Sequence, residues 1–395
     1  MTALHPTALI VGYARTPFVK FNGSFAALPA TELGGHAIAA ALKQAGISPD
    51  AVQHVIAGQV LQGGAGQNPA RQSAVAAGIP LTVPAITLNA VCLSGTEAIV
   101  AGVRLIAAGE VDIVVAVGQE SMSLAPHAMV GGRAGKKYGA IELLDTLEHD
   151  GLTDAFEQRS MGSSTEERNA PLGILRDEQD AFAAASHARL AAATDFLAGE
   201  IAPFTIAGRR GDVVVSVDDG LRAGTTTETL ATLRPAFGAG GTVTAGNSSQ
   251  LTDGAAAVVL MSAEAAAARG IRGIARVVSH AFVAGPDVSL HAQPANAIAA
   301  ALTKTDFSAS DLVAVEINEA FASVGVHSTR VLGVDESIVN ANGGAIALGH
   351  PIGASGARIV GHLARRLEAL GSGSLGAAGI CGGGGQGSAI VLVAV

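Results

Sequence analysis

Tryptophan is absent from this chain of 395 residues, and all aromatic residues together make up only 3% of it. Charged residues are also scarce, at 14%, and they leave a formal net charge of −9 at pH 7. An acidic chain offers no basic surface to nucleic acid or to an anionic membrane. No apolar run is long enough to cross a bilayer. We therefore expect neither nucleic acid nor a membrane as a partner.

Cysteine occurs only twice, at Cys92 and Cys381. Neither has the Cys-x-x-Cys or His-x-x-x-His spacing of a zinc site, so we expect no bound metal. A chain of this length does not need a disulfide, and two unpaired cysteines indicate a reducing compartment. The first residues lack the basic and apolar regions of a secretory signal. The expected location is the cytoplasm.

Small and aliphatic residues are abundant, with 51 glycines and 49% hydrophobic residues. Apolar stretches at 8–12, 55–61 and 111–117 are typical of buried strands. Helical spacing covers residues 30–45, and Asn68 followed by Pro69 predicts the start of a second helix. Strands alternating with helices predict an α/β fold with a mostly parallel sheet covered on both faces.

A second series of strands and helices begins after residue 270. Strands are expected at 273–278, 312–317 and 388–395, helices at 295–302 and up to about 370, and a glycine-rich turn at 376–387. Both series contain a loop that enters a long helix, followed by a Gly-Gln turn. We expect two similar halves packed as a pseudo-dimer, formed by residues 1–122 with 247–270 and by residues 271–395. Residues 123–246 lose the pattern and are expected to form an inserted loop domain that binds substrate or a neighbouring subunit.

Cys92 lies at the start of a predicted helix that ends near Ala108. The N–H groups of a first helical turn lack backbone partners and lie at the positive end of the helix dipole. Both features favour the thiolate, so we expect a lowered pKa and a nucleophilic role for Cys92. The alternative is a small buried cysteine without reactivity.

His350 and Cys381 lie beside glycine-rich backbone, as Cys92 does. A nucleophilic thiol needs a base, and histidine titrates in the right range. A second cysteine can remove a proton from carbon and return it. N–H groups in glycine turns can bind an oxyanion. Taken singly, His350 is also explained as a helix-capping residue, and Cys381 as a small residue in a crowded turn.

The motifs around these residues resemble those of the thiolase family, over essentially the whole chain. They are Asn-Ala-Val-Cys-Leu-Ser-Gly around Cys92, Asn-Glu-Ala-Phe from Asn318, the run 340–356 with Gly-His-Pro-Ile-Gly, Cys-Gly-Gly-Gly-Gly-Gln-Gly from Cys381, Gly-Gln-Asn-Pro-Ala-Arg at 66–71 and Gly-Gln-Glu-Ser-Met-Ser at 118–123. The resemblance implies two α/β halves stacked as five layers (αβαβα), with a loop domain inserted in the first half.

The resemblance also implies a reaction. Cys92 would carry an acyl group as a thioester, His350 would activate it, and Cys381 would move the proton at the α-carbon. Asn318 would hold a water in one oxyanion hole, and the N–H groups of Cys92 and Gly383 would form the other. The reaction would be a reversible Claisen condensation of two acetyl-CoA to acetoacetyl-CoA and CoA, within fatty acid metabolism. Acyl-CoA and CoA would be substrates, and no cofactor would be bound permanently.

Further positions resemble residues of the family that contact CoA or other subunits. Arg222 is similar to a residue at the adenine end of CoA, and Ser249 to one at the pantetheine. Arg133, Lys136 and Lys137 resemble a basic loop near the CoA phosphates and the tetramer core; an exposed basic turn is the alternative. A homodimer or homotetramer is implied.

Two segments depart from the family pattern. Ser160 stands where thiolases usually have a histidine, in Ser-Met-Gly, and residues 290–294 read Leu-His-Ala-Gln-Pro in place of Met-Gly-x-Gly-Pro. Both segments are expected at the acyl pocket, so a degradative 3-ketoacyl-CoA thiolase for longer chains is an alternative. A ketoacyl synthase would carry a histidine in place of Cys381. A catalytically silent acyl-CoA- or lipid-binding relative is the alternative from another class.

Overall fold

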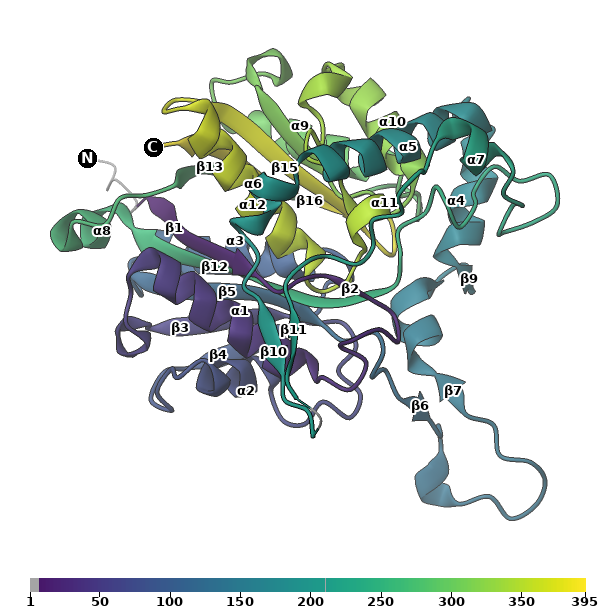
Figure 1. Cartoon of the computed structure of the whole chain (residues 1–395), viewed down its shortest axis with the longest axis horizontal. Helices are drawn as coiled ribbons and strands as arrows, with labels where there is room; N and C mark the ends of the chain where they lie inside the picture. The colour runs from purple at the N-terminus through teal and green to yellow at the C-terminus, as the bar shows by residue number, and fades with distance from the viewer. Residues whose placement is uncertain (1–6, 210) are drawn as a thin grey trace.

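A single ten-stranded sheet forms the frame of the molecule (Figure 1). The computed structural model describes residues 7–209 and 211–395. The strands of this sheet are β1 (Ala8–Arg15), β2 (Val19–Lys20), β3 (His54–Gly58), β4 (Ala85–Leu88), β5 (Ile113–Glu120), β12 (Thr252–Ser262), β13 (Ala275–Ala284), β14 (Ala314–Ile317), β15 (Leu375–Gly382) and β16 (Gln386–Ala394).

The strand order is β14-β15-β16-β13-β1-β12-β5-β3-β4, with β2 beside β12. Only the outer pairs are parallel: β14 with β15, and β3 with both β4 and β5. The five central pairs, from β15–β16 to β12–β5, are antiparallel. The prediction of a mostly parallel sheet was therefore wrong. The antiparallel pairing has a partly local cause. A short turn joins β15 to β16, and two strands joined in this way must be antiparallel.

Three apolar cores fill the space between five layers of helix and sheet, because the middle core surrounds the central helices. The first core lies between the outer helices α1 (Ala30–Ala45) and α2 (Pro69–Ala76) and one face of the N-terminal strands. The second surrounds α3 (Ser94–Ala107) and α12 (Ser355–Leu370) and contacts strands of both halves. The third lies under α9 (Gln293–Leu302), beside α10 (Ala322–Leu332). This confirms the predicted αβαβα arrangement.

The two halves repeat one topology. β3 and β5 correspond to β14 and β15, β12 corresponds to β16, and β1 corresponds to β13. Even β4 has a counterpart, because Val339 forms a parallel bridge to Val315 of β14. The halves join where β1 meets β13, with Leu9 opposite Arg276 and Ile10 opposite Ala275. In Figure 1 these halves are the purple to blue part with the green strand β12 and the part that runs from green to yellow, and they repeat one topology, as predicted.

Local signals in the sequence placed the helices well. α1 has the predicted bounds, and it ends at Gly46 with φ of 66°. Asn68 caps α2, as predicted, by accepting a hydrogen bond from the N–H of Arg71, and Pro69 is its first residue. Most of the expected turn at 376–387 is strand β15 instead. Glycine is used there for close packing, because a Cβ on Gly379 would lie 2.9 Å from the Ile298 side chain.

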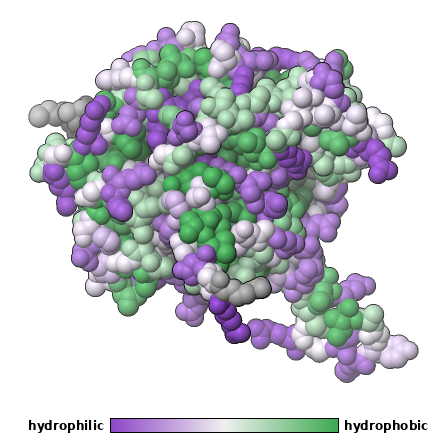
Figure 2. All heavy atoms as spheres, viewed as in Figure 1, coloured by the Kyte–Doolittle hydropathy of each residue, from purple (hydrophilic) through white to green (hydrophobic). Residues whose placement is uncertain are grey.

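Between β5 and β12 the chain forms short helices and two-stranded hairpins. These elements are β6 (His127–Ala128), β7 (Leu144–Asp145), β8 (Thr153–Asp154), β9 (Arg159–Ser160), α4 (Met161–Asn169), α5 (Arg176–Ala192), α6 (Thr194–Ala198), β10 (Phe204–Ile206), β11 (Val213–Val215) and α7 (Thr227–Ala231). The tip between β6 and β7 projects from the body (Figure 1). Apolar side chains gather on it (Figure 2), among them the exposed Val130, Tyr138 and Ile141. In the described residues, no helix is long and apolar enough to span a membrane.

A buried ion network anchors this segment to the core. The Arg15 guanidinium pairs with Glu200 at 2.7 Å and with Asp218 at 2.6 Å. His362 of α12 lies 2.9 Å from the other oxygen of Glu200. Burial raises the pKa of Glu200, but His362 and Arg15 outweigh burial and lower this pKa to about 2. Glu200 is therefore ionised and shared between the sheet and a central helix.

We predict that Glu200→Gln lowers the free energy of unfolding at pH 7 by about 3–5 kcal/mol, because it removes one of the two carboxylates that pair with the buried Arg15 guanidinium. The lowered pKa of Glu200 stabilises the fold above its unfolded pKa of about 4.3, and this contribution is lost as pH falls toward 2. The variant should therefore lose less stability than the parent between pH 7 and pH 3 in urea titrations. Glu368→Gln, on the exposed end of α12, is the control. An equal acid dependence in all three proteins would contradict the prediction.

Candidate active site

Residues from distant parts of the chain line one cavity of about 60 Å³. Asn318 is linked to this cavity, because its Nδ2 lies 3.4 Å from His350 Nε2. Of the residues predicted to be catalytic or to contact CoA, Arg222 and the basic loop residues Arg133, Lys136 and Lys137 lie outside this group. The cavity lining includes Cys92, Ser249, His350, Cys381 and Gly383.

Cys92 follows a strained turn. Val91 has φ of 52°, a left-handed conformation that is unfavourable for a β-branched residue. The turn is held by the Val91 N–H, which donates to Asn89 Oδ1 at 2.8 Å, and by Ser94 Oγ, which donates to the Val91 carbonyl at 2.6 Å. Strain held in place by its surroundings is typical of functional sites. The turn directs Cys92 into the cavity just before α3, as predicted.

The backbone N–H groups of Cys92 and Gly383 face the Cys92 sulfur. They lower its pKa, but burial raises it more, to about 12. The expectation of a lowered pKa was therefore wrong, because a low-dielectric surrounding disfavours the thiolate more than two donors favour it. In the resting protein Cys92 is a thiol, and a base must accept its proton before it can attack.

His350 has the protonation state of a base. Burial and the positive charge of Arg358 lower its pKa to about 4, so the ring is neutral. Its Nδ1 lies 2.5 Å from Ser355 Oγ, which donates its own proton to the Pro351 carbonyl at 3.1 Å. Ser355 therefore accepts from Nδ1–H, and Nε2 is left without a proton. This nitrogen receives the Asn318 amide and lies at the cavity.

Asn318 follows the end of β14, and Asn340 fixes its position. Asn340 Oδ1 accepts from the Ile317 N–H at 2.8 Å, and its Nδ2 donates to the Ile317 carbonyl at 2.8 Å. Asn318 Oδ1 is buried and has no hydrogen-bond partner among the described residues. A buried amide oxygen without a partner is costly, and an ordered water satisfies such a group. The role of Asn318 in holding a water stays a prediction.

Cys381 lies near the end of β15 and is fully buried. Burial, with a smaller effect of nearby Cys92, raises the pKa of Cys381 well above its usual value. The resting site therefore contains two thiols and one neutral imidazole. Proton transfer from Cys92 to His350 would create two charges, which preorganised donors such as the N–H groups of Cys92 and Gly383 would have to stabilise.

Glu120 joins the loops around the site, a role that was not predicted from the sequence. Its carboxylate accepts the N–H groups of Val60, Leu61 and Gly353 at 2.9–3.1 Å. Burial raises the pKa of Glu120 to about 7, although these three donors favour the charged form. Ser355, Asn340 and Glu120 are the positioning residues that sequence reasoning missed. Only their place in the quoted motifs could have drawn attention to them.

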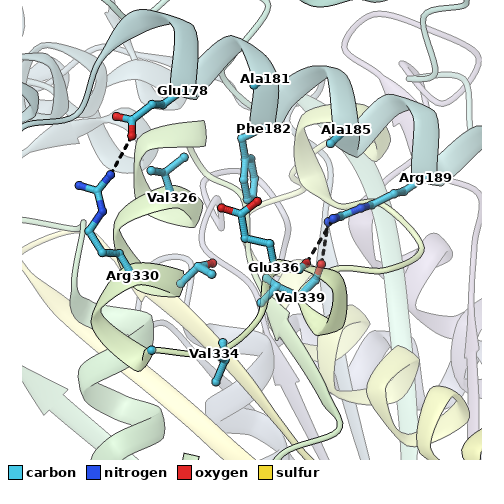
Figure 3. A pocket seen from close by; sticks show the side chains of 12 residues that line it. Glu178, Ala181, Phe182, Ala185, Arg189, Val326, Arg330, Val334, Glu336 and Val339 are labelled. Carbon is cyan, nitrogen blue, oxygen red and sulfur yellow. Dashed lines mark hydrogen bonds and ion pairs between the residues drawn. The ribbon is translucent and has the colours of Figure 1, made fainter.

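A larger groove of about 460 Å³ lies between α5 and α10 (Figure 3). Glu178 and Arg330 point toward each other across it and pair at 2.9 Å. Arg189 donates to the carbonyl oxygens of Val339 and Glu336. The residues that line this groove include neither cysteine nor histidine. Volume therefore does not identify the reactive site, whereas the group of two thiols and an imidazole does.

Two family models match this chain. Residues 8–264 match the model described as "Thiolase, N-terminal domain", and residues 271–394 match "Thiolase, C-terminal domain". The chain belongs to the thiolase family. Both models together cover nearly the whole chain, so the thiolase resemblance found in the motifs is confirmed.

Individual thiolases are similar over the full length. A "Probable acetyl-CoA acetyltransferase" of Mycobacterium leprae is 51% identical over 392 residues, which cover 98% of this chain and 100% of that protein. An "Acetyl-CoA acetyltransferase" of Pseudomonas aeruginosa is 46% identical, with 97% of this chain and 98% of that protein covered. The crystal structure of the Bacillus anthracis acetyl-CoA acetyltransferase superposes with a TM-score of 0.94 at 37% identity, and 99% of each chain is covered.

Both segments that depart from the thiolase pattern adjoin the cavity, although Ser160 itself does not line it. Ser160 precedes α4 and caps it, because its Oγ accepts the N–H of Ser163 at 3.2 Å. The next residue, Met161, lines the cavity, as does Leu290 of the second departing segment. The chain therefore differs from its family pattern at the wall of the cavity and retains the reactive groups.

Arg222 is exposed, and its N–H donates to His187 Nδ1 at 3.3 Å. It does not line the cavity, whereas Ser249 does. Contact of either residue with CoA stays a prediction.

We predict that alkylation of Cys92 by iodoacetamide becomes about tenfold faster with each pH unit from 7 to 10, because only the thiolate reacts and the pKa of Cys92 is about 12. The Cys381→Ala variant should be used, so that one sulfur is followed by mass spectrometry. A rate that levels off near pH 8 would show a lowered pKa. The fully denatured chain, in which cysteine has its ordinary pKa of about 8.5, is the control.

Proposed function

We propose that this protein is a thiolase that converts two acetyl-CoA to acetoacetyl-CoA and CoA, reversibly, through an acyl group on Cys92. The observation that carries the proposal is the meeting of two thiols and a neutral imidazole in one buried cavity, with two backbone N–H groups aimed at the Cys92 sulfur. The names of the similar proteins agree with it.

In the first half-reaction, His350 Nε2 accepts the Cys92 proton and the sulfur attacks the thioester carbon of acetyl-CoA. Oxygen becomes negative, and the N–H groups of Cys92 and Gly383 stabilise it. The carbon–sulfur bond to CoA then breaks. The leaving CoA sulfur takes the proton of Cys381, which is available because burial keeps Cys381 a thiol. The products are acetyl-Cys92, CoA, protonated His350 and the Cys381 thiolate.

In the second half-reaction, the Cys381 thiolate removes a proton from the methyl of a second acetyl-CoA. The enolate oxygen is stabilised by protonated His350 and by a water on Asn318. The enolate carbon attacks acetyl-Cys92, and the carbon–sulfur bond to Cys92 breaks. His350 returns its proton to Cys92, so the site regains its starting state. Free CoA thioesters are the only co-reactants, and no permanent cofactor takes part.

The size of the cavity supports a short acyl group. Since a water needs about 10–15 Å³ of such space, 60 Å³ accommodates roughly four to six groups of that size. An acetyl thioester has two carbons, one oxygen and one sulfur. A chain of six or more carbons would have to displace the wall. CoA would reach the cavity past Ser249, with its adenine end toward Arg222.

We further propose the division into domains at 1–122 with 247–270, 123–246 and 271–395, since the core strand β5 ends at Glu120 and β12 begins at Thr252. Both cysteines are free, which fits a reducing compartment such as the cytoplasm. β4 is the last strand of the sheet and exposes Ile86, which favours pairing with a second copy. The apolar tip between β6 and β7 favours a homotetramer.

Cys92→Ser should abolish the acyl-enzyme, because a hydroxyl of ordinary pKa is a poor nucleophile. Cys381→Ala should still acylate, because CoA can leave as its thiolate and take a proton from solvent, but it should exchange α-protons with deuterated water about 10²–10⁴-fold more slowly. Mass spectrometry of the intact chain after mixing with acetyl-CoA detects the acyl group, and NMR of acetyl-CoA follows the exchange. Normal turnover in Cys92→Ser would overturn the proposed function. Intact CoA binding without any acylation of the parent chain would indicate the silent relative.

The tetramer proposal has its own test. Replacing Val130, Tyr138, Ile141 and Leu143 by serine should convert tetramers to dimers in light scattering, because the tip then lacks its apolar contact surface. Replacing the exposed Val213 and Val214 of β11 by serine is the matched control and should leave the mass unchanged. Monomers in the unaltered protein would contradict the proposal.

A further inference from the structure

Three apolar side chains form part of the cavity wall beside Cys381. Met161, Leu290 and Phe321 line it, and they pack in one cluster with Cys381. They come from separate segments: Met161 begins α4, Leu290 precedes α9, and Phe321 precedes α10. The spacing of these segments therefore sets the length of chain that the cavity admits.

His291, next to Leu290, is completely buried and does not line the cavity. Its Nε2 lies 2.9 Å from Asn169 Oδ1. The carbonyl oxygen of Asn169 can only accept, so Nε2 carries the proton, and Nδ1 is free to accept from Ser289 Oγ at 3.3 Å. Burial lowers the pKa of His291 to about 4, so the ring stays neutral in this bond.

Asn169 is the last residue of α4, the helix that begins with Met161. Its Nδ2 donates to Thr242 Oγ1 at 2.9 Å, and Thr242 Oγ1 donates to Glu166 at 2.9 Å. Glu166 also accepts the N–H of Val243. α4 is therefore fixed along its length, and its end is bonded to the segment that carries Leu290.

The third wall residue is tied to the same point. Ser328 Oγ of α10 donates to the His291 carbonyl at 2.7 Å. α10 directly follows Phe321, so His291 is bonded to the helices behind both Met161 and Phe321. A glycine, which the family pattern has at this position, has no side chain to form the bond to Asn169.

We propose that His291 is a specificity-determining residue that fixes the spacing of Met161, Leu290 and Phe321 and so restricts the enzyme to acyl chains of two to four carbons. The proposal rests on the proposed thiolase function. His291 acts through its neighbours: it touches neither sulfur and takes no part in proton transfer. Loss of its bond to Asn169 lets the walls separate and admits longer chains.

The test compares kcat/KM for thiolysis of acetoacetyl-CoA and of 3-ketooctanoyl-CoA. In His291→Ala the ratio of the long to the short substrate should rise at least about tenfold, since pocket contacts with one methylene are worth about 10–200-fold. Asn169→Ala removes the same bond from the other side and should raise the ratio similarly. His291→Gln keeps a donor and should stay near the parent ratio.

Two further variants guard against misinterpretation. His327→Ala removes the imidazole that lies edge-on to His291, with ring centroids 6.2 Å apart, and should not change the ratio. Ser328→Ala removes a single hydroxyl, so we expect it to fold, and it should raise the ratio by a smaller factor. An unchanged ratio in Ser328→Ala and in every folded variant at His291 or Asn169 overturns the proposal, as does an equal rise in His327→Ala. A parent enzyme without thiolysis of either substrate would instead overturn the proposed function.

Discussion

The site depends on the close crossing of α3 and α12 at the centre of the molecule. A Cβ on Gly95 would lie 2.6 Å from the backbone nitrogen of Ala357, and one on Gly356 would lie 2.4 Å from that of Thr96. Only glycine allows two helix starts to approach so closely. Each helix is preceded by a reactive residue, Cys92 before α3 and His350 before α12. The contact between the two halves therefore also brings nucleophile and base to one cavity.

Burial determines the protonation states of Cys92, His350 and Cys381. Charged groups in this cavity would lose hydration, so both cysteines stay protonated and His350 stays neutral. The same burial strengthens every donor that faces the developing oxyanion, because few waters compete with it. In the proposed reaction, the N–H group of Cys92 would face an oxygen that becomes negative. It does not keep a thiolate ready in the resting protein.

Features of the fold that depend on residues close together in the sequence could be predicted, whereas features that depend on residues far apart along the chain could not. Caps such as Asn68 and stops such as Gly46 act within a few residues, so α1 and α2 were predicted correctly. β1 pairs with β12 and β13 across most of the chain, and nothing local reveals that these pairs are antiparallel. Cys92, His350 and Cys381 were singled out because their motifs are long, and the structure brings all three to one cavity. Ser355 and Asn340 were not singled out, because their roles depend on contacts, and the pKa of Cys92 was wrong because burial depends on the whole fold.

The repeated halves and the inserted segment contribute different residues to the cavity. Cys92, His350 and Cys381 all come from the two repeated halves, whereas Met161 and the Asn169 end of α4 belong to the insertion. The insertion is also held to the core through Arg15 and Glu200, neither of which lines the cavity, so part of its attachment does not depend on the wall residues. Changes at Ser160 and at residues 290–294 can therefore alter the shape of the pocket without displacing the reacting groups. This explains why the chain departs from its family at the wall and keeps the thiols and the imidazole.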